Sequence, residues 1–192
     1  MPFAATIDRR VFCCHGGIPR ALNDDSDPRP LLERIAAIER PVSEEELEAD
    51  PTQLAMDLMW ADPATADEEH AHTASLRRSA SKQRAASESN SLAVDGFAPN
   101  LLRGGDAIVF GKVAVDKFVH HTGLTHLIRA HQPPEMGIEY AKGARILTVF
   151  SSSHYCGNNS AAVVMAARGE LKVATTRQQV GLQPTTSQYF VV

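Results

Sequence analysis

Apolar positions fall into short runs along the first part of the chain. Thr6 to Cys14 alternate loosely and become fully apolar before His15-Gly16-Gly17, which predicts one strand that runs into the interior and ends at a glycine turn. Pro30 to Arg40 has apolar residues at helical spacing, and this pattern predicts a short amphipathic helix that stops at Pro41. A second apolar stretch extends from Leu54 to Trp60.

The pattern changes between about residues 64 and 95, where Ala, Ser, Glu, Lys and Arg dominate and large apolar side chains nearly vanish. Such a stretch buries too little apolar surface to offset its conformational entropy. We therefore expect a polar, low-complexity insertion here that is disordered or loosely helical.

Two short motifs lie in this insertion. His70-Ala71-His72, beside Glu68 and Glu69, has groups that bind metals weakly, but a solvated loop is the interpretation we favour. Arg78 stands three residues before Ser81, which is the spacing of a site for a basophilic kinase. A phosphate there adds negative charge to the segment.

Helical and strand patterns alternate in the second half of the chain. Apolar spacing predicts a helix from Lys112 to His121, with Gly123 as its C-terminal cap. Apolar runs between turns predict further strands at Thr125–Ala130, Arg145–Phe150, Ala161–Ala166 and Glu170–Thr175. The expected fold class is α/β, with strands that become mostly antiparallel late in the chain and with no internal repeat.

Composition and charge exclude several classes of protein. The net charge of -4 argues against a nucleic-acid partner, which normally meets a basic face. No window approaches the about 18 apolar residues that cross a bilayer, so we expect no membrane span, and the N-terminus does not have the pattern of a cleaved secretory signal. Three cysteines are too few for a disulfide framework, which favours reduced thiols and a cytoplasmic or nuclear location.

Five residues are candidates for chemistry. His15 and His131 each follow a predicted strand, and imidazole at a strand end suits a transition metal, although a hydrogen-bonded structural histidine is an equally good interpretation of the pair. Arg103 stands beside two glycines and can present a guanidinium fork to phosphate, or it is an exposed turn residue. The Tyr155 hydroxyl can donate to an oxyanion, or its ring caps the core edge. On its position alone, Asp62 is a turn residue before proline.

These residues lie in five motifs that together resemble the phosphoprotein phosphatase family, the metal-dependent serine/threonine phosphatases. The motifs occur in the family's order from residue 2 to about residue 175. The nine residues Phe97 to Gly105 are similar to the corresponding sequence motif of the family's EF-hand-containing branch. The five motifs are Val11-Phe12-Cys13-Cys14-His15-Gly16-Gly17-Ile18-Pro19, Asp57-Leu58-Met59-Trp60-Ala61-Asp62-Pro63, Arg103-Gly104 with Phe110-Gly111, Leu127-Ile128-Arg129-Ala130-His131-Gln132, and Thr148-Val149-Phe150-Ser151-Ser152-Ser153-His154-Tyr155-Cys156-Gly157.

The resemblance implies a role for each candidate. It makes His15 and His131 metal ligands, Arg103 the arginine that holds the substrate phosphate, and Tyr155 a residue of the same pocket, with Asp62 as an acidic residue nearby. It further implies a β-sandwich flanked by helices and two divalent ions of the manganese, iron or zinc type. The implied reaction is hydrolysis of phosphoserine and phosphothreonine in protein substrates, with regulatory protein subunits as further partners.

Departures from the family pattern limit this expectation. The family's D-x-H, G-D-x-x-D-R-G and G-N-H-E motifs, which supply the other metal ligands, a second phosphate arginine and the general acid, are absent from the sequence. Residues 1–192 therefore match the C-terminal half of the catalytic domain, and we expect them to be inactive alone. Three alternatives stay open: part of an active enzyme, an inactive pseudo-phosphatase or binding module, and a remnant that does not fold.

Overall fold

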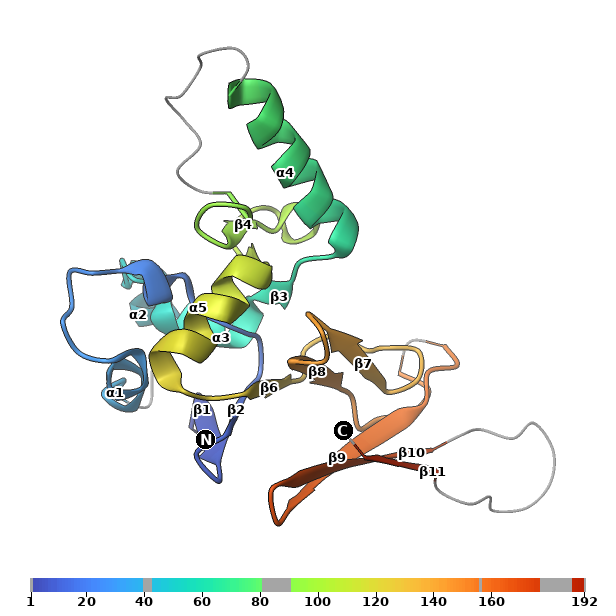
Figure 1. Cartoon of the computed structure of the whole chain (residues 1–192). Coiled ribbons are helices and arrows are strands. Elements are labelled where there is room, and N and C mark those ends of the chain that lie inside the picture. The colour runs from blue at the N-terminus through green and yellow to red at the C-terminus, as the bar shows by residue number, and fades with distance from the viewer. Residues whose placement is uncertain (1, 40–42, 81–90, 156, 177–187, 192) are drawn as a thin grey trace.

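The computed structural model describes residues 2–39, 43–80, 91–155, 157–176 and 188–191 (Figure 1). Its α-helices are α1 (Leu31–Ala36), α2 (Glu44–Ala49), α3 (Leu54–Trp60), α4 (Ala66–Ala80) and α5 (Lys112–Thr122), and its 3-10 helices are η1 (Arg20–Asn23) and η2 (Leu101–Arg103). Its strands are β1 (Ala4–Ile7), β2 (Val11–Cys14), β3 (Asp62–Pro63), β4 (Phe97–Pro99), β5 (Ile108–Phe110), β6 (His126–Arg129), β7 (Ile138–Ala141), β8 (Ile146–Val149), β9 (Ala161–Ala167), β10 (Glu170–Thr176) and β11 (Gln188–Val191). The mixture confirms the α/β class.

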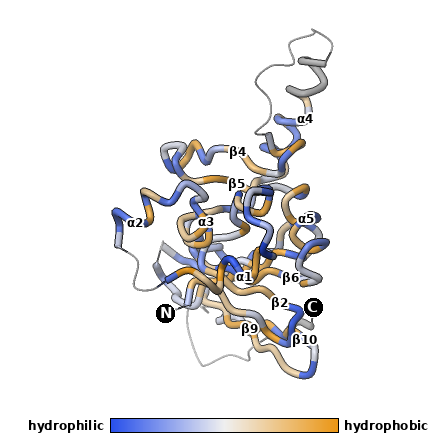
Figure 2. The backbone as a smooth tube through the Cα atoms, turned by 90° about the vertical axis from the view of Figure 1, so that its left-hand side faces the viewer, coloured by the Kyte–Doolittle hydropathy of each residue, from blue (hydrophilic) through white to orange (hydrophobic). Residues whose placement is uncertain are grey.

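A five-stranded mixed sheet in the order β1-β2-β6-β8-β7 organises the chain. Strands β2, β6 and β8 are parallel to one another, and β1 and β7 are antiparallel edge strands. Phe12 and Leu127 from this sheet share one buried core with Leu58 of α3 and Phe118 of α5. Figure 2 shows apolar stretches around β2, β6 and the neighbouring helices, whereas α4 extends away from them.

The expected single strand from Thr6 to Cys14 is wrong, because the chain turns back on itself there. Strands β1 and β2 form an antiparallel hairpin in which Ile7 pairs with Val11. The turn between them contains Asp8 at φ 50° and Arg9 at φ 52°, in the left-handed region that a tight hairpin turn requires. Three consecutive charged residues, Asp8 to Arg10, therefore mark a turn and not the middle of a strand.

The first half of the polar segment is a regular helix. Thr65 and Glu68 form a reciprocal cap, since the Glu68 carboxylate accepts from the Thr65 backbone N–H at 2.7 Å and the Thr65 hydroxyl accepts from the Glu68 N–H at 3.2 Å. Glu69 then accepts from Lys142 Nζ at 2.7 Å, which fixes the first turn of α4 to the β7–β8 turn. His70 and His72 lie on this helix, so the expected solvated loop at this motif is wrong. Ser81 lies outside the described residues.

Most of the other expected elements are confirmed. Helix α5 ends at Thr122 and is capped by Gly123. This glycine has a left-handed φ of 70°, a conformation that favours glycine as a cap. Strands β6, β8, β9 and β10 lie within two residues of their predicted bounds. Helix α1 is shorter than expected and ends at Ala36. Among the described residues, no helix is long and apolar enough to span a membrane.

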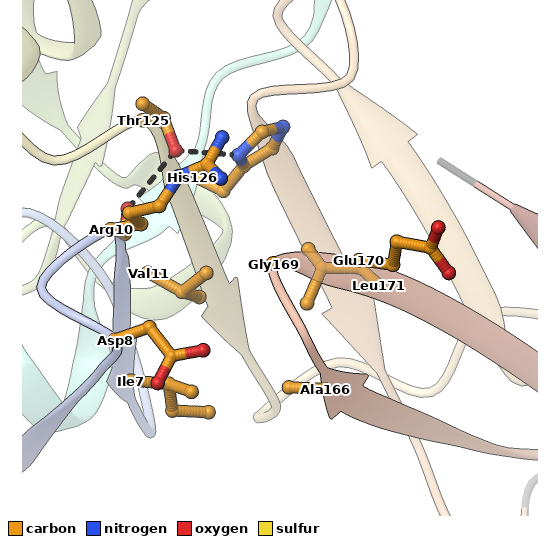
Figure 3. A pocket seen from close by; sticks show the side chains of 10 residues that line it. All are labelled: Ile7, Asp8, Arg10, Val11, Thr125, His126, Ala166, Gly169, Glu170 and Leu171. Atoms are coloured by element: carbon orange, nitrogen blue, oxygen red, sulfur yellow. Dashed lines mark hydrogen bonds between the residues drawn. The ribbon is translucent and has the colours of Figure 1, made fainter.

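The β9–β10 hairpin belongs to a second sheet, in the order β11-β10-β9, in which β9 pairs antiparallel with β10. Leu171 and Val173 of β10 are buried. Near the β9–β10 turn, a small pocket separates this sheet from the β1–β2 hairpin and the start of β6, and both Val11 and Leu171 line it (Figure 3). Late in the chain the strands are therefore antiparallel, as expected.

Candidate functional site

The parallel strands β2 and β6 end beside each other, and each is followed by a histidine. Cys13 pairs with Ile128 in the sheet, and the Ala130 N–H donates to the His15 carbonyl at 3.1 Å. His15 Nε2 consequently lies 3.1 Å from His131 Nδ1, and the two rings meet edge to face with centroids 5.0 Å apart. Residues 116 positions apart are thus joined at the carboxyl edge of the sheet, which is where parallel sheets place their ligand sites.

Gly16 allows the loop after β2 to lie directly against α3. Its N–H donates to the Leu58 carbonyl at 2.7 Å, and a Cβ atom at this position would lie 2.5 Å from the backbone of Met59 and Trp60. Trp60, the last residue of α3, places its ring edge to face with His131 at a centroid distance of 5.0 Å. The glycine therefore brings the end of α3 to the histidine pair.

Asp62 is the first residue of β3, two residues after the end of α3, and it is 4% exposed. Its Oδ1 accepts from Arg129 Nη2 at 2.8 Å, and its Oδ2 accepts from Arg103 Nε at 2.7 Å and from Asn100 Nδ2 at 3.0 Å. One buried carboxylate thus holds an arginine of β6 together with an arginine and an asparagine of the η2 loop. The turn role expected from its position before Pro63 does not describe these contacts.

Arg129 is the functional residue that the sequence analysis did not single out. It is 1% exposed, and its guanidinium donates to the Gly16 carbonyl at 2.6 Å, to the Ala61 carbonyl at 3.2 Å, to the side chain of Gln132 and to Asp62. A buried arginine requires such partners because an unpaired charge is costly away from water. The signal in the sequence is a charged residue that follows Leu127-Ile128 within a strand otherwise typical of a core.

Arg103 extends from the same carboxylate toward solvent. Its side chain is 31% exposed, and its Cζ lies 5.8 Å from the centroid of the Trp60 ring. The Arg103 Nε–H donates to Asp62. Among the described residues, neither Nη atom of Arg103 makes a hydrogen bond. The terminal nitrogens of a guanidinium are the pair that forms bidentate contacts with phosphate oxygens.

The electrostatic surroundings keep both histidines neutral at pH 7. Burial, followed by the nearby Arg103, lowers the pKa of His131 to about 4. Burial, followed by Arg129, lowers the pKa of His15 from its usual 6.5. His131 Nε2 is also buried without a hydrogen-bond partner among the described residues. Neutral imidazole nitrogens carry the lone pairs that metal coordination requires.

Tyr155 does not join the other four candidates. It is 69% exposed, its ring packs against Phe150 at a centroid distance of 5.1 Å, and its backbone N–H donates to Asn159 Oδ1 at 2.8 Å. No hydrogen bond or ring contact within the described part of the chain links it to the histidines or to Arg103. His154, which stands where the family motif has asparagine, has a φ of 56°, a conformation that asparagine adopts more readily.

The donor set is only partly suited to a metal centre. Within the described ranges, no group of three or more His, Cys, Asp and Glu side chains is placed to hold a metal ion. Asp62, the carboxylate nearest the pair in the network, already accepts from three donors. The described residues therefore provide two imidazoles, and a dinuclear centre needs bridging carboxylates in addition.

Comparison with known proteins agrees with these motifs. No family model matches the chain. The serine/threonine-protein phosphatase BSL2 of Arabidopsis thaliana is 31% identical over 170 residues, which cover 88% of this chain and 13% of that protein. A protein serine/threonine phosphatase from Saccharomyces cerevisiae with similarity to human phosphatase PP5 shares the fold, with a TM-score of 0.57 at 22% identity over 100% of this chain and 46% of that one. The motifs and this relative support a fragment of a phosphoprotein phosphatase, and the chain spans 13% of the length of BSL2.

Proposed function

We propose that these residues form one wall of a metal-dependent site that hydrolyses phosphoserine and phosphothreonine in proteins. The observation that carries the proposal is the placement of the His15–His131 pair beside Arg103, which Asp62 holds through its Nε atom. Phosphatases of this family are metal-dependent. Such a site needs metal ligands next to a cation that binds the phosphate, and the two neutral imidazoles beside an arginine support this assignment.

In this proposal His15 Nε2 and His131 Nδ1 bind the same divalent ion. These two nitrogens lie 3.1 Å apart, so both would be within reach of one ion. Two divalent ions of the manganese, iron or zinc type supply a hydroxide nucleophile and neutralise the phosphoryl charge when they are bound. The two imidazoles would hold one side of that centre, and burial, followed by the neighbouring arginines, lowers the pKa of both.

Arg103 binds the substrate phosphate in the proposed site. Its Nη atoms lack a hydrogen bond among the described residues, and the Asp62 carboxylate fixes the plane of the guanidinium. Arg129 is a positioning residue, because it ties Asp62 to the loops that carry both histidines. We propose the Tyr155 hydroxyl as a second donor to the phosphate, a role that requires its ring to leave Phe150.

A second proposal is an inactive binding module, and the donor set favours it for residues 1–192 taken alone. The described residues offer two imidazoles and no free carboxylate beside them. A phosphoprotein and a regulatory protein subunit are the partners we propose in either case. Cys13 and Cys14 are free thiols, which supports a reducing location in the cytoplasm or nucleus.

Metal binding tests the proposed ligands directly. We expect calorimetric titration with Mn²⁺ or Zn²⁺ to give one site that His131→Ala weakens at least about tenfold, because one of two nitrogen ligands is lost. His126→Ala is the matched control, since His126 lies at the opposite end of β6, and its affinity should stay within about twofold of the unmodified chain. Equal affinities of all three proteins would contradict the proposed ligands.

A phosphatase assay tests whether residues 1–192 are active by themselves. We expect the 192 residues, supplied with Mn²⁺, to give no measurable turnover of a phosphoserine peptide, because the carboxylate ligands and the general acid are missing. Robust turnover that disappears in His131→Ala overturns this expectation and assigns the activity to the chain itself.

A further inference from the structure

Two leucines beside the proposed phosphate arginine are almost fully exposed. Leu101 is 84% and Leu102 is 94% exposed, and both lie on η2, which ends at Arg103. A single exposed leucine is common on protein surfaces, but two adjacent ones form a local apolar surface. We call Leu101 and Leu102 the leucine step.

The leucine step is held in place by its surroundings. The Asn100 carbonyl accepts from the Arg103 N–H and the Gly105 N–H, each at 3.0 Å, and the Asn100 N–H donates to the Ala107 carbonyl at 2.8 Å. The Asn100 side chain donates to Asp62 at 3.0 Å, so the base of the loop is tied to the carboxylate that holds Arg103. The loop therefore presents its leucines at a fixed position relative to the arginine.

The described residues leave both leucines almost uncovered. Covering a leucine removes apolar surface from water, so a ligand that covers both gains affinity. Trp60 is 43% exposed and lies under the Arg103 guanidinium, with its ring centroid 5.8 Å from Cζ. Because Leu102 directly precedes Arg103, a phosphate bound to Arg103 brings the neighbouring residues of its peptide close to the segment that carries the leucine step.

We propose that the leucine step binds an apolar side chain next to the phosphorylated residue of a protein substrate, and so gives the site a preference for apolar flanking residues. This inference rests on the proposed role of Arg103. The occupant follows from continuity along the chain, because Leu102 directly precedes Arg103. An extended peptide advances about 3.3 Å per residue, so side chains one or two positions from the phosphoresidue reach the step. Leucine side chains offer no partner to a charged flanking residue, which favours apolar ones.

The test compares two phosphoserine peptides that differ only in their flanking residues. One has leucine on both sides of the phosphoserine within two positions, and the other has serine at the same positions. Binding is measured by fluorescence anisotropy with Mn²⁺ present. The proteins are the unmodified chain, the double variant Leu101→Ser with Leu102→Ser, and Val163→Ser as a matched control at an exposed apolar side chain of β9.

We expect the unmodified chain and the Val163→Ser control to bind the leucine-flanked peptide about tenfold more tightly, which corresponds to part of the burial of one leucine. The double variant should reduce this ratio to about twofold or less. Thermal melting of each protein checks folding, and the exposed positions predict unchanged curves.

The outcomes distinguish the inference from the proposed function. Equal binding of both peptides to the unmodified chain, with inorganic phosphate as a competitor, overturns the leucine step alone. A preference that survives in the double variant also overturns it. Binding that inorganic phosphate does not displace, or no binding of either peptide, overturns the phosphate role of Arg103 and the inference with it.

Discussion

The two ends of the parallel pair β2–β6 contain similar residues in different surroundings. At the carboxyl end, His15 and His131 meet next to a carboxylate and two arginines. At the amino end, His126 lies half-buried near Arg10, and its Nδ1 contacts the Thr125 hydroxyl at 2.9 Å, beside the pocket of Figure 3. Both ends combine imidazole with guanidinium, but only the carboxyl end joins several loops through a buried ion pair.

Histidine and arginine occur at both ends, so residue type alone does not distinguish them. The hydrogen-bond network around these residues distinguishes the candidate site. At the amino end, the polar groups beside the small pocket bond to near neighbours. The Thr125 hydroxyl and the Thr125 N–H both donate to the Arg10 carbonyl. At the carboxyl end, Arg129 ties the loops after β2, α3 and β6 together. The arrangement at the carboxyl end therefore depends on three loops that are distant from one another in the sequence.

The largest effect should follow from removing the carboxylate of that network. Asp62→Ala leaves Arg129 buried and without its ionic partner, and we expect a loss of about 3–5 kcal/mol in the free energy of unfolding. At the other end, His126→Ala removes one hydrogen bond of a half-buried ring and should cost about 1 kcal/mol. Urea unfolding measures both values, and equal losses would remove the distinction between the two ends. A cooperative transition in the unmodified chain also excludes the remnant that does not fold.

A glycine at each end gives the next comparison. Gly16→Ala puts a Cβ 2.5 Å from the backbone of Met59 and Trp60, so α3 must move, at a cost of about 3 kcal/mol. Gly169→Ala meets only the tip of Arg10 at 3.2 Å, which can move aside, and the remaining cost is the left-handed φ of 77°, about 1 kcal/mol. Thermal melting should give the larger decrease in Tm for Gly16→Ala. The reverse order would show that the contact between α3 and the β2 loop is not tight.

The smallest effect concerns pH. Burial, followed by Arg10 and Arg145, lowers the pKa of His126 below its usual 6.5. The unfolded chain then binds more protons than the folded chain as the pH falls below 6.5, so this ring makes the protein less stable in that range and has no such effect above it. His126→Gln should reduce the difference between the free energies of unfolding measured at pH 7.5 and pH 5.5. A difference identical to that of the unmodified chain would refute the assignment.

The sequence predicts the elements whose signals are local. The helix from Lys112 is confirmed because its apolar spacing and Gly123 both act within a few residues. The strands around Leu127 and Leu147 are confirmed because short apolar runs between turns are a local signal of a strand. The hairpin at Asp8 was not predicted, because the apolar pattern on both sides of the turn looked continuous.

The site residues also divide into those with a local sequence signal and those whose role depends on distant contacts. The motifs identified His15, His131, Arg103 and Asp62, and the structure brings all four together. They did not single out Arg129, since its importance lies in contacts with residues 67 and 113 positions away in the sequence. Tyr155 was predicted in the same pocket, but its loop directs it toward Phe150.

The sequence by itself determined the resemblance to phosphoprotein phosphatases, the fold class and the two histidines at strand ends, because each depends on residue order and short-range pattern. Only the tertiary structure decided which groups meet. The His15–His131 contact, the three donors on Asp62 and the exposure of the leucine step all depend on segments that are distant along the chain. Parallel pairing of β2 with β6 is the physical reason, because it places the ends of both strands at one edge of the sheet.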